Sequence, residues 1–592
     1  MRMRCRPRWL PLCVLLVFCM LLPSCVPPQQ HWDLDLSEGS QDTAAPPPSA
    51  TPKPAFTSAA AATPTPAAQP NTPIPDAVPI PAAGQLRLAV REGIRTLDPY
   101  LVTNASEELV SSLLYDTLLM DASPRGLAPN LATRWELSPD GVNVTFWLNP
   151  QARWHDGQPV TANDVIFSYG LANERQFQGW AAVAALVDRL EAIHSDEVRF
   201  TLLTVRADAV RILGTELWIL PAHLWADVND ALVAPSPDNP VGSGPLRFVE
   251  RGEGDQLILG NTRTHHSADP SMDSLVVEIL PNENQGLQAL KDGELDVLGW
   301  DVSPSVARDV MDNADDYQGI QLAQAPGSRT QTLLFNLRQA PYDNQSFRQA
   351  LAQAIDRQAI VDDVLKGFGD VATAGLFPLS SPWRKADISP IAFNPQRASE
   401  ELDRAGVVDR DGDGLRDNPD GSPLLVPISC PDLPDLVRLA ELVAASWEVL
   451  GVAAEVRPIA QDLVTPVLMQ AAFDVLVYSI SLHEPEMAYF GFHSSRGSLN
   501  NGHVLGLNYG GYSNPEYDEF AAASLKELNP EQRQVLLHQL QDILATDLPQ
   551  IPLYHPRVLN LYRDDRFTDW SPEAGLGLLT RTTIVNLTLS ED

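Results

Sequence analysis

The chain has 592 residues, with 76 acidic and 41 basic side chains and a formal net charge of −35 at pH 7. So acidic a composition makes nucleic acid an unsuitable partner, because phosphate binding needs clustered Lys and Arg. The chain is also longer than one hydrophobic core usually organises, about 250–300 residues, so we expect several domains.

The first 25 residues have the order of a secretory leader. Four arginines precede an apolar run over residues 9–22, which Leu22-Pro23-Ser24 and Cys25 follow. The run is too short for a bilayer, which needs about 20 apolar residues, and is typical of a signal peptide. Leu22 and Ser24 resemble the bacterial lipobox, whose cysteine is acylated, although Pro23 is unusual there and leaves ordinary secretion as the alternative. We predict a lipoprotein signal peptide over 1–25 and a mature protein anchored to the cell membrane by lipid on Cys25, either periplasmic or on the cell surface.

The next 58 residues, 26–83, are rich in Pro, Ala, Thr, Ser and Gln. They have few apolar side chains to bury, so we expect a disordered tether. Beyond residue 25 the only cysteine is Cys430. The mature chain therefore has no intramolecular disulfide and must be stabilised by burial of its core.

From residue 84 onward strand and helix signals interleave, which predicts an α/β protein. Residues 86–90 form a short apolar strand pattern, and a helix is expected to begin near Ser106. Residues 142–147 alternate apolar and polar side chains, as in a half-buried strand. Thr161 then opens a helix with a capping hydroxyl.

A second helix signal lies near the C-terminus. Asn529-Pro530 is a helix start, because Asn caps and Pro suits the first helical position. Leucines at 537, 540 and 544 then share one face. Leu548-Pro549 ends the helix, and residues 551–554 predict a strand.

The segment from Leu127 to Tyr169 contains the most distinctive combination of residues in the chain. These residues are Leu131-Ala132, Trp135, Ser138, Asp140-Gly141, Phe146, Leu148, Trp154, Asp156-Gly157, Pro159, Thr161-Ala162, Asp164-Val165 and Phe167-Ser168. This segment closely resembles the signature of the family 5 extracellular solute-binding proteins, which include the dipeptide, oligopeptide and nickel-binding proteins of ABC importers. Residues 242–246, 290–297, 341–357 and 393–406 resemble further motifs of that family. The resemblance spans about residues 84–592.

The resemblance implies a type II periplasmic-binding fold, an α/β architecture of two lobes with a hinge and an extra domain inserted in the first lobe. Lobe I would comprise residues 84–325 and 548–592, with an inserted domain at about 111–240. Lobe II would comprise residues 326–547. The chain would cross between lobes near residues 327–336 and again near 548–555, and two crossings make a hinge that can close on a ligand.

Strand ends and loops of both lobes should line the cleft, where aromatic side chains and a few polar groups suit a ligand pocket. Each aromatic candidate could equally be a core residue, and His483 an ordinary loop histidine. The candidates are Arg91, Glu92 and Trp300 in lobe I, and Trp383, Tyr478, Ser481, His483, Glu484 and Asn508 in lobe II.

One position departs from the family pattern. In the peptide-binding relatives, an Asp four residues before the second-lobe Pro holds the α-amine of the ligand. Here that position is Ser481, counted back from Pro485. Glu484 or Glu92 could take over this role. Peptides, nickel, sugars and other small solutes all remain open as ligands.

Catalytic and metal motifs are weak. The sequence His483-Glu-Pro-Glu-Met487 begins like HExxH, but Met487 replaces the second histidine and Pro485 would disturb the helix. Tandem histidines at 265 and 266 lie in a polar segment that predicts a solvated turn. Acids at the first positions of the Asp409–Asp420 segment resemble a calcium loop, but position 12 lacks the usual Glu, so a surface hairpin is the favoured interpretation.

We therefore predict a receptor, not an enzyme, without a cofactor. It would capture a peptide or similar small solute as a monomer and deliver it to an ABC permease and ATPase. The alternative is a receptor of the same fold that signals to a membrane partner.

Overall fold

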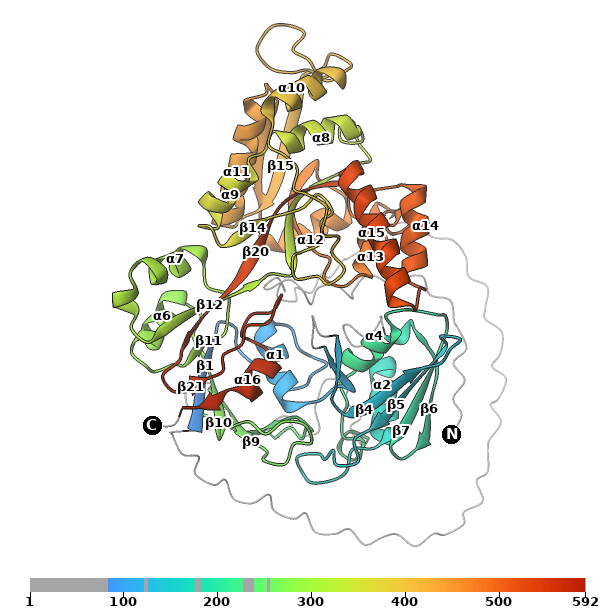
Figure 1. Cartoon of the computed structure of the whole chain (residues 1–592), viewed down its shortest axis with the longest axis vertical. Helices are drawn as coiled ribbons and strands as arrows, with labels where there is room; N and C mark the ends of the chain where they lie inside the picture. The colour runs from blue at the N-terminus through green and yellow to red at the C-terminus, as the bar shows by residue number, and fades with distance from the viewer. Residues whose placement is uncertain (1–83, 122–125, 176–182, 227–238, 253–255, 591–592) are drawn as a thin grey trace, which may run out of the picture. The chain divides into compact units, whose positions relative to one another are not determined.

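The computed structural model describes residues 84–121, 126–175, 183–226, 239–252 and 256–590 (Figure 1). The predicted leader, Cys25 and the predicted tether lie outside these residues. Among the described residues, no helix combines the length and the apolar character that crossing a membrane requires. The names lobe I, inserted domain and lobe II are kept below for the ranges given above, and those boundaries stay predictions.

A twelve-stranded sheet runs through both lobes in the order β16-β15-β17-β13-β20-β11-β1-β10-β9-β8, with β12 and β14 also paired to β20. Its longest member, β20 (Gln550–Arg563), changes partners along its length. Its first half pairs antiparallel with β13 (Arg329–Phe335) and β14 (Gly369–Val371), and its second half pairs with β12 (Ile320–Pro326). This single strand therefore joins the sheet regions of the two lobes (Figure 1).

Lobe I contains parallel β1 and β10, with antiparallel β9 and β8 at the edge. In α1, the Asn104 side chain accepts a hydrogen bond from Glu107 N at 2.9 Å, which fixes the helix start. The elements are β1 Gln85–Val90, α1 Ala105–Leu114, β8 Leu246–Arg251, β9 Leu257–Asn261, β10 Ser274–Ile279, α6 Glu283–Lys291, β11 Val297–Leu298, α7 Pro304–Asp312, η4 Ala314–Tyr317, β21 Phe567–Thr568, α16 Arg581–Asn586 and β22 Thr588–Leu589.

The inserted domain has its own antiparallel sheet in the order β4-β5-β7-β6. The predicted strand at 142–147 is observed as β5, and the predicted helix begins at Ala162. The Thr161 hydroxyl does not cap as predicted: it donates to Asp164 Oδ2 at 2.9 Å, and that carboxylate also accepts from Thr161 N at 2.8 Å. The elements are β2 Leu119–Asp121, β3 Leu127–Pro129, β4 Ala132–Leu137, β5 Asn143–Leu148, α2 Ala162–Arg175, β6 Val187–His194, β7 Glu197–Leu202, α4 Ala209–Thr215 and α5 Ala222–Trp225.

Lobe II places helices beside the β16-β15-β17-β13 part of the large sheet. The predicted late helix is observed as α15, which Asn529 caps and which ends as Leu548 adopts a left-handed φ of 45°. The elements are α8 Gln345–Gln353, α9 Arg357–Val364, α10 Pro395–Arg404, β15 Leu425–Pro431, α11 Pro434–Glu448, β16 Ala453–Ile459, α12 Gln461–Met469, β17 Val475–Ser481, α13 Met487–Phe492, η5 Ser494–Arg496, β18 Leu499–Asn500, β19 His503–Val504, α14 Pro515–Ser524 and α15 Pro530–Asp547.

The buried apolar side chains fall into separate clusters that follow this organisation. One continuous cluster contains β1 of lobe I and β5 of the inserted domain, where Phe146 meets Phe200 edge-on at 5.8 Å. A second cluster contains Phe335 and Trp447 of lobe II together with the first half of β20, and a third contains Tyr517 of lobe II. Because apolar burial is the main driving force of folding, these clusters are the main source of stability in the described residues.

Candidate functional site

A pocket of about 340 Å³ lies where the inserted domain meets lobe II. Three predicted site residues, Trp383, His483 and Glu484, line it. The full lining is Asp121, Gly126, Leu127, Ala207, Asp208 and Arg211 from the inserted domain, and Pro382, Trp383, His483, Glu484, Pro485, Glu486 and Arg533 from lobe II.

The loop after β17 supplies the lobe II wall of this pocket. The strand ends at Ser481, and the chain turns so that Met487 N donates to Glu484 O at 3.0 Å before α13 begins. Pro485 removes a backbone donor inside the turn, which is tolerated because the helix has not yet started. The turn therefore directs the side chains of Glu484 and Glu486 towards the inserted domain.

Ion pairs cross or border the pocket. Arg211 Nε lies 3.0 Å from Glu484 Oε2 across the boundary between the two parts, and Arg211 Nη1 lies 3.2 Å from Glu216. Within lobe II, Arg533 Nη2 lies 3.1 Å from Glu486 Oε1. Asp208, which is 2% exposed, accepts from Arg206 Nε at 2.8 Å.

Burial dominates the electrostatics of these acids. It raises the pKa of Glu484 to about 7 against the opposing charge of Arg211, with smaller increases from Glu486, Asp121 and Glu216. Burial, followed by Glu486, also raises the pKa of Asp208. The His483 pKa is lowered, first by burial, so this ring is neutral at physiological pH. Glu484 and Asp208 therefore hold their protons to a higher pH than ordinary carboxyl groups do.

Trp383 forms an aromatic wall beside these charges. Gln541 Nε2 donates to Trp383 O at 2.9 Å, which fixes the backbone of the wall. The Arg533 guanidinium carbon lies 5.5 Å from the centre of the indole ring. Arg533 is therefore held between Trp383 and Glu486 and is already matched in charge.

The predicted lobe I residues form a different group. The Arg91 guanidinium lies 4.8 Å from the Trp300 ring centre, and Arg91 Nη2 lies 2.9 Å from Glu283 Oε1. Trp300 is 8% exposed and packs so closely on Gly286 that a Cβ there would come within 2.6 Å of the ring. Glu92 is half-buried on the same loop. None of these three predicted residues lines the pocket described above.

Two charged residues that the sequence did not point to lie near the strand crossings. Asp301 follows Trp300, and Asn560 Nδ2 of β20 donates to Trp300 O at 3.3 Å and Asp301 Oδ1 at 3.5 Å. Burial of the carboxyl group among its neighbours raises the pKa of Asp301 to about 6, although the residue as a whole is exposed to solvent. Arg329 is the strongest opposing charge and pairs in register with Ser481.

The remaining predicted residues of lobe II have mainly structural contacts. Tyr478 meets Tyr509 edge-on at 6.2 Å, and Ser481 Oγ donates to Ser328 O at 3.1 Å. Asn508 is 2% exposed, and its side chain makes four backbone hydrogen bonds, to Phe492 O, His493 O, Tyr512 O and Tyr512 N. Asn508 therefore organises the loop around it, and its role in the cleft stays a prediction.

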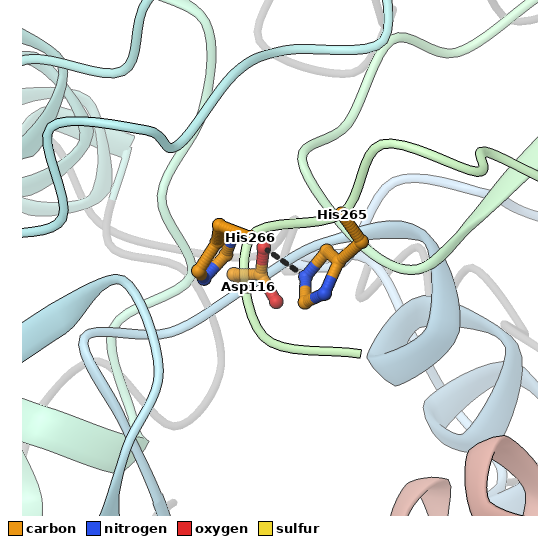
Figure 2. A group of neighbouring side chains, drawn as sticks. All are labelled: Asp116, His265 and His266. Carbon is orange, nitrogen blue, oxygen red and sulfur yellow. Dashed lines mark ion pairs between the residues drawn. The ribbon is translucent and has the colours of Figure 1, made fainter. Parts of the chain in front are cut away.

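The tandem histidines are not in a solvated turn, so that expectation was wrong. The side chains of His265 and Asp116 are completely buried, with His265 Nε2 at 3.4 Å from Asp116 Oδ2 (Figure 2). Asp116, His265 and His266 are close enough to share a metal ion. However, both ring nitrogens of His265 already have protein partners: Nδ1 accepts from Ala268 N at 2.9 Å, and Arg581 Nη2 lies 3.3 Å from Nε2. With Arg581 Nη2 at 2.6 Å from Asp116 Oδ1, the group forms an ion-pair network rather than a ligand set.

In the Asp409–Asp420 segment, the acids at 409, 411 and 413 are exposed and lie close together. Their carboxylates accept backbone hydrogen bonds of their own loop, for example from Gly412 N to Asp409 Oδ1 at 2.7 Å. Bridges of Asp417 to Val408 and Pro423 give the segment the form of a surface hairpin. Calcium binding there stays untested.

Residues 126–500 match the family model of the bacterial extracellular solute-binding proteins, family 5. The chain belongs to this family. Among its relatives, the dipeptide-binding protein of Escherichia coli is 25% identical over 61% of this chain and 69% of that protein. The oligopeptide-binding protein AppA of Bacillus subtilis is 24% identical over 77% of this chain and 83% of that protein.

Solved structures confirm the predicted fold class of this family 5 protein. A periplasmic oligopeptide-binding protein of an ABC transporter from Thermotoga maritima has a TM-score of 0.74 at 21% identity, with 86% of this chain and all of that chain covered. NikA from Brucella suis, solved with Fe(III)-EDTA, has a TM-score of 0.73 at 19% identity, with 86% of this chain and all of that chain covered. The fold is thus the α/β periplasmic-binding architecture of the family.

Membership of family 5 also settles two broader expectations. The family consists of solute-binding proteins, so this chain is a binding protein and, as predicted, not an enzyme. The family is extracellular, which agrees with the prediction that the protein works outside the cytoplasm.

Proposed function

We propose that this family 5 protein is the receptor of an ABC importer and captures a peptide, or a solute of similar chemistry, between its lobes. The observation that carries the proposal is the pocket whose walls come from both the inserted domain and lobe II. A ligand bound there contacts two separately packed parts of the chain, so binding favours the arrangement in which they are close together. That closed form is what a permease has to recognise.

The ligand class rests on the site and on the relatives together. The pocket volume of about 340 Å³ lies at the lower end of the range for small-molecule sites, about 300–1,000 Å³. Its lining combines charged side chains with apolar surface, including one aromatic wall, and this mixture suits part of a peptide. Relatives named for dipeptides and oligopeptides support the same class, whereas the relative named for heme and the structure named for a nickel complex keep other solutes as competitors.

Native mass spectrometry of freshly purified protein tests this function. We expect the folded protein to carry a co-purified mass in the range of short peptides, which fragments into an amino-acid ladder. The variant Trp383→Ala, which removes the aromatic wall, should lose most of that mass, and Trp570→Ala, at a ring that packs on Tyr562 in lobe I, is the matched control. A metal chelate or a sugar in place of peptide would contradict the ligand class.

The lipid anchor belongs to the same proposal. Leu22-Pro23-Ser24-Cys25 at the end of the apolar leader supports acylation of Cys25, and the segment up to residue 83 would then tether the receptor near its permease. Replacement of Cys25 by Ala should move the protein from the membrane fraction to the soluble fraction with its melting temperature unchanged. An unchanged membrane fraction would contradict acylation.

A transport assay distinguishes import from signalling. If the protein serves an importer, membrane vesicles that contain the permease and ATPase should take up the ligand when the protein is added, whereas a receptor that only signals should cause no uptake.

A further inference from the structure

Three acids that line the pocket between the inserted domain and lobe II each have an arginine of their own. The pairs are Arg206 Nε with Asp208 Oδ1 at 2.8 Å, Arg211 Nε with Glu484 Oε2 at 3.0 Å, and Arg533 Nη2 with Glu486 Oε1 at 3.1 Å. The other acid of the lining, Asp121, is exposed to solvent and has interactions of its own. The charges of the pocket wall are therefore paired before a ligand enters.

A charged ligand group of either sign would disturb these pairs. A cation would share a carboxylate with the arginine that already holds it, and an anion would share an arginine with its carboxylate. The pair of Arg533 and Glu486 resists such an exchange most strongly, because only 8% and 6% of these side chains are exposed and water screens their charges poorly. The pocket therefore favours a ligand group without a net charge.

Two atoms of the wall, one donor and one acceptor, have no hydrogen-bond partner among the described residues. Arg211 Nε is buried, and its N–H makes no hydrogen bond with Glu484 Oε2 although that oxygen is 3.0 Å away. Glu486 is 5% exposed; its Oε1 faces Arg533, and its Oε2 is buried without a donor. Buried polar atoms are nearly always hydrogen-bonded, so this donor and this acceptor mark a place for a polar group of the ligand.

The donor and the acceptor come from opposite walls of the pocket. Arg211 lies in α4 of the inserted domain, and Glu486 directly precedes α13 of lobe II. Burial lowers the pKa of Arg211, but nearby acids raise it above its ordinary value, and the charge of Glu486 contributes most to that rise. The two side chains therefore lie near each other, and one small ligand group can reach both.

We infer that this pocket binds an uncharged carboxamide of the ligand, whose carbonyl oxygen accepts from Arg211 Nε and whose amide nitrogen donates to Glu486 Oε2. A carboxamide fits because it holds an acceptor and a donor on separate atoms of one rigid plane. The inference rests on the proposed receptor function and specifies the preferred ligands, which are peptides with a glutamine or asparagine side chain. Such a group touches both walls, so the hydrogen bonds that select it also favour the closed arrangement.

Calorimetry at pH 8, above the raised pKa of Glu484, compares peptides that differ in one side chain. Ala-Gln-Ala and Ala-Asn-Ala carry the amide at two lengths, Ala-norleucine-Ala has no polar group, and Ala-Glu-Ala and Ala-Lys-Ala carry one charge of each sign. We expect the better amide peptide to bind about ten- to a hundredfold more tightly than the norleucine peptide, the usual range for a hydrogen bond to a charged group. Both charged peptides should bind more weakly than that amide peptide.

Arg211→Met should reduce the preference for amide over norleucine to less than threefold. Loss of the ion pair with Glu484 affects all peptides alike, so the ratio of two affinities reports the hydrogen bond itself. Arg199→Met is the matched control, because it removes a guanidinium from another ion pair of the inserted domain, and it should keep the wild-type ratio. If Arg211→Met does not fold, Glu486→Gln decides, because it keeps an oxygen for Arg533 but places a donor where Oε2 was.

The outcomes separate the inference from the function on which it rests. If neither amide peptide binds more tightly than the norleucine peptide, or a charged peptide binds most tightly, the inference is overturned and the peptide receptor stays intact. An amide preference that persists in Arg211→Met would overturn it as well. Binding of glutaramide in place of every peptide, lost in Arg211→Met, would uphold the carboxamide site and remove peptides as the ligand class. Binding of no probe would overturn both.

Discussion

Arg211 Nε of the inserted domain lies 3.0 Å from Glu484 Oε2 of lobe II. A backbone hydrogen bond from Ala207 N to Leu525 O, at 2.8 Å, joins the same two parts of the chain. The ion pair is partly accessible, with 23% of the Arg211 side chain and 29% of the Glu484 side chain exposed. Any movement that opens the pocket must break these contacts, so they act as a weak clasp between the inserted domain and lobe II.

The first prediction tests this clasp. Arg211→Met should shift the ligand-free protein towards open forms, because a partly exposed ion pair contributes about 0.2–1 kcal/mol. Spin labels at residues 189 and 441, both exposed, report the distance between the inserted domain and lobe II. Arg199→Met is the control, since Arg199 pairs with Glu197 inside the inserted domain. An identical distance distribution in Arg211→Met and Arg199→Met would contradict the clasp.

The second prediction concerns pH. Burial, with Glu486, Asp121 and Glu216, raises the pKa of Glu484 from 4.5 to about 7 against the charge of Arg211. The folded protein therefore binds an extra proton between these pH values, and the free energy of unfolding falls as pH rises from about 4.5 to 7. We expect a loss on the order of 1–3 kcal/mol from this group, and no further loss from it above pH 7.

Urea unfolding at pH 5 and pH 8 measures this loss. In Glu484→Gln the difference between the two pH values should shrink by the same amount, because glutamine does not titrate. Glu441→Gln should keep the wild-type difference. Equal pH dependence in Glu484→Gln and wild type would show that Glu484 titrates normally.

Much of the fold could be predicted because the signals are local. Asn529-Pro530 and the leucine spacing located α15, and the motif between residues 127 and 169 identified the family. The long strand β20 was predicted only over residues 551–554, and Pro556, which cannot donate a ladder hydrogen bond, gives no local signal that the strand continues. In the structure Pro556 lies where β20 exchanges β13 and β14 for β12, so it marks a change of partners.

The site was harder to predict because its charges come from distant segments. Glu484 was predicted because it lies in the loop after a strand. Arg211 and Asp208 were not predicted, because Arg211 lies in the short helix α4 and Asp208 directly precedes it, and no sequence motif marks this helix. Asp116 could have been noticed as a single acid in an apolar run, Leu113 to Met120, which is a signal for a buried charge with a partner. The partner Arg581 could not be found this way, since no pattern connects it to Asp116.

The third prediction follows from that buried network. Burial by itself would raise the pKa of Asp116, but Arg581 and His265 hold the pKa well below its usual range. Asp116→Asn should destabilise the protein by roughly 3–5 kcal/mol, because Arg581 is left as a buried charge without its counter-ion. Asp269→Asn, at an exposed position close in sequence to His265 and His266, should change stability by less than about 0.5 kcal/mol. Urea unfolding measures both, and the combined variant Asp116→Asn/Arg581→Met should lose less than the sum of the single losses.

The last prediction concerns the crossing between β12 and β13. A Cβ on Gly327 would lie 2.1 Å from Pro556 O, so the two crossing segments approach as closely as glycine permits. Ser380 Oγ also donates to Gly327 O at 2.9 Å, which fixes this peptide from the other side. Gly327→Ala should push β20 away and destabilise the protein by about 1–3 kcal/mol, and it should change the distance between labels at residues 189 and 441.

Gly170→Ala is the control, because a Cβ there meets no atom within 4 Å inside α2 and should stabilise the helix by about 0.5–1 kcal/mol. If Gly327→Ala left both the stability and the label distance unchanged, the crossing would have enough space for a Cβ atom at residue 327. The proposed hinge would then lie elsewhere in the chain.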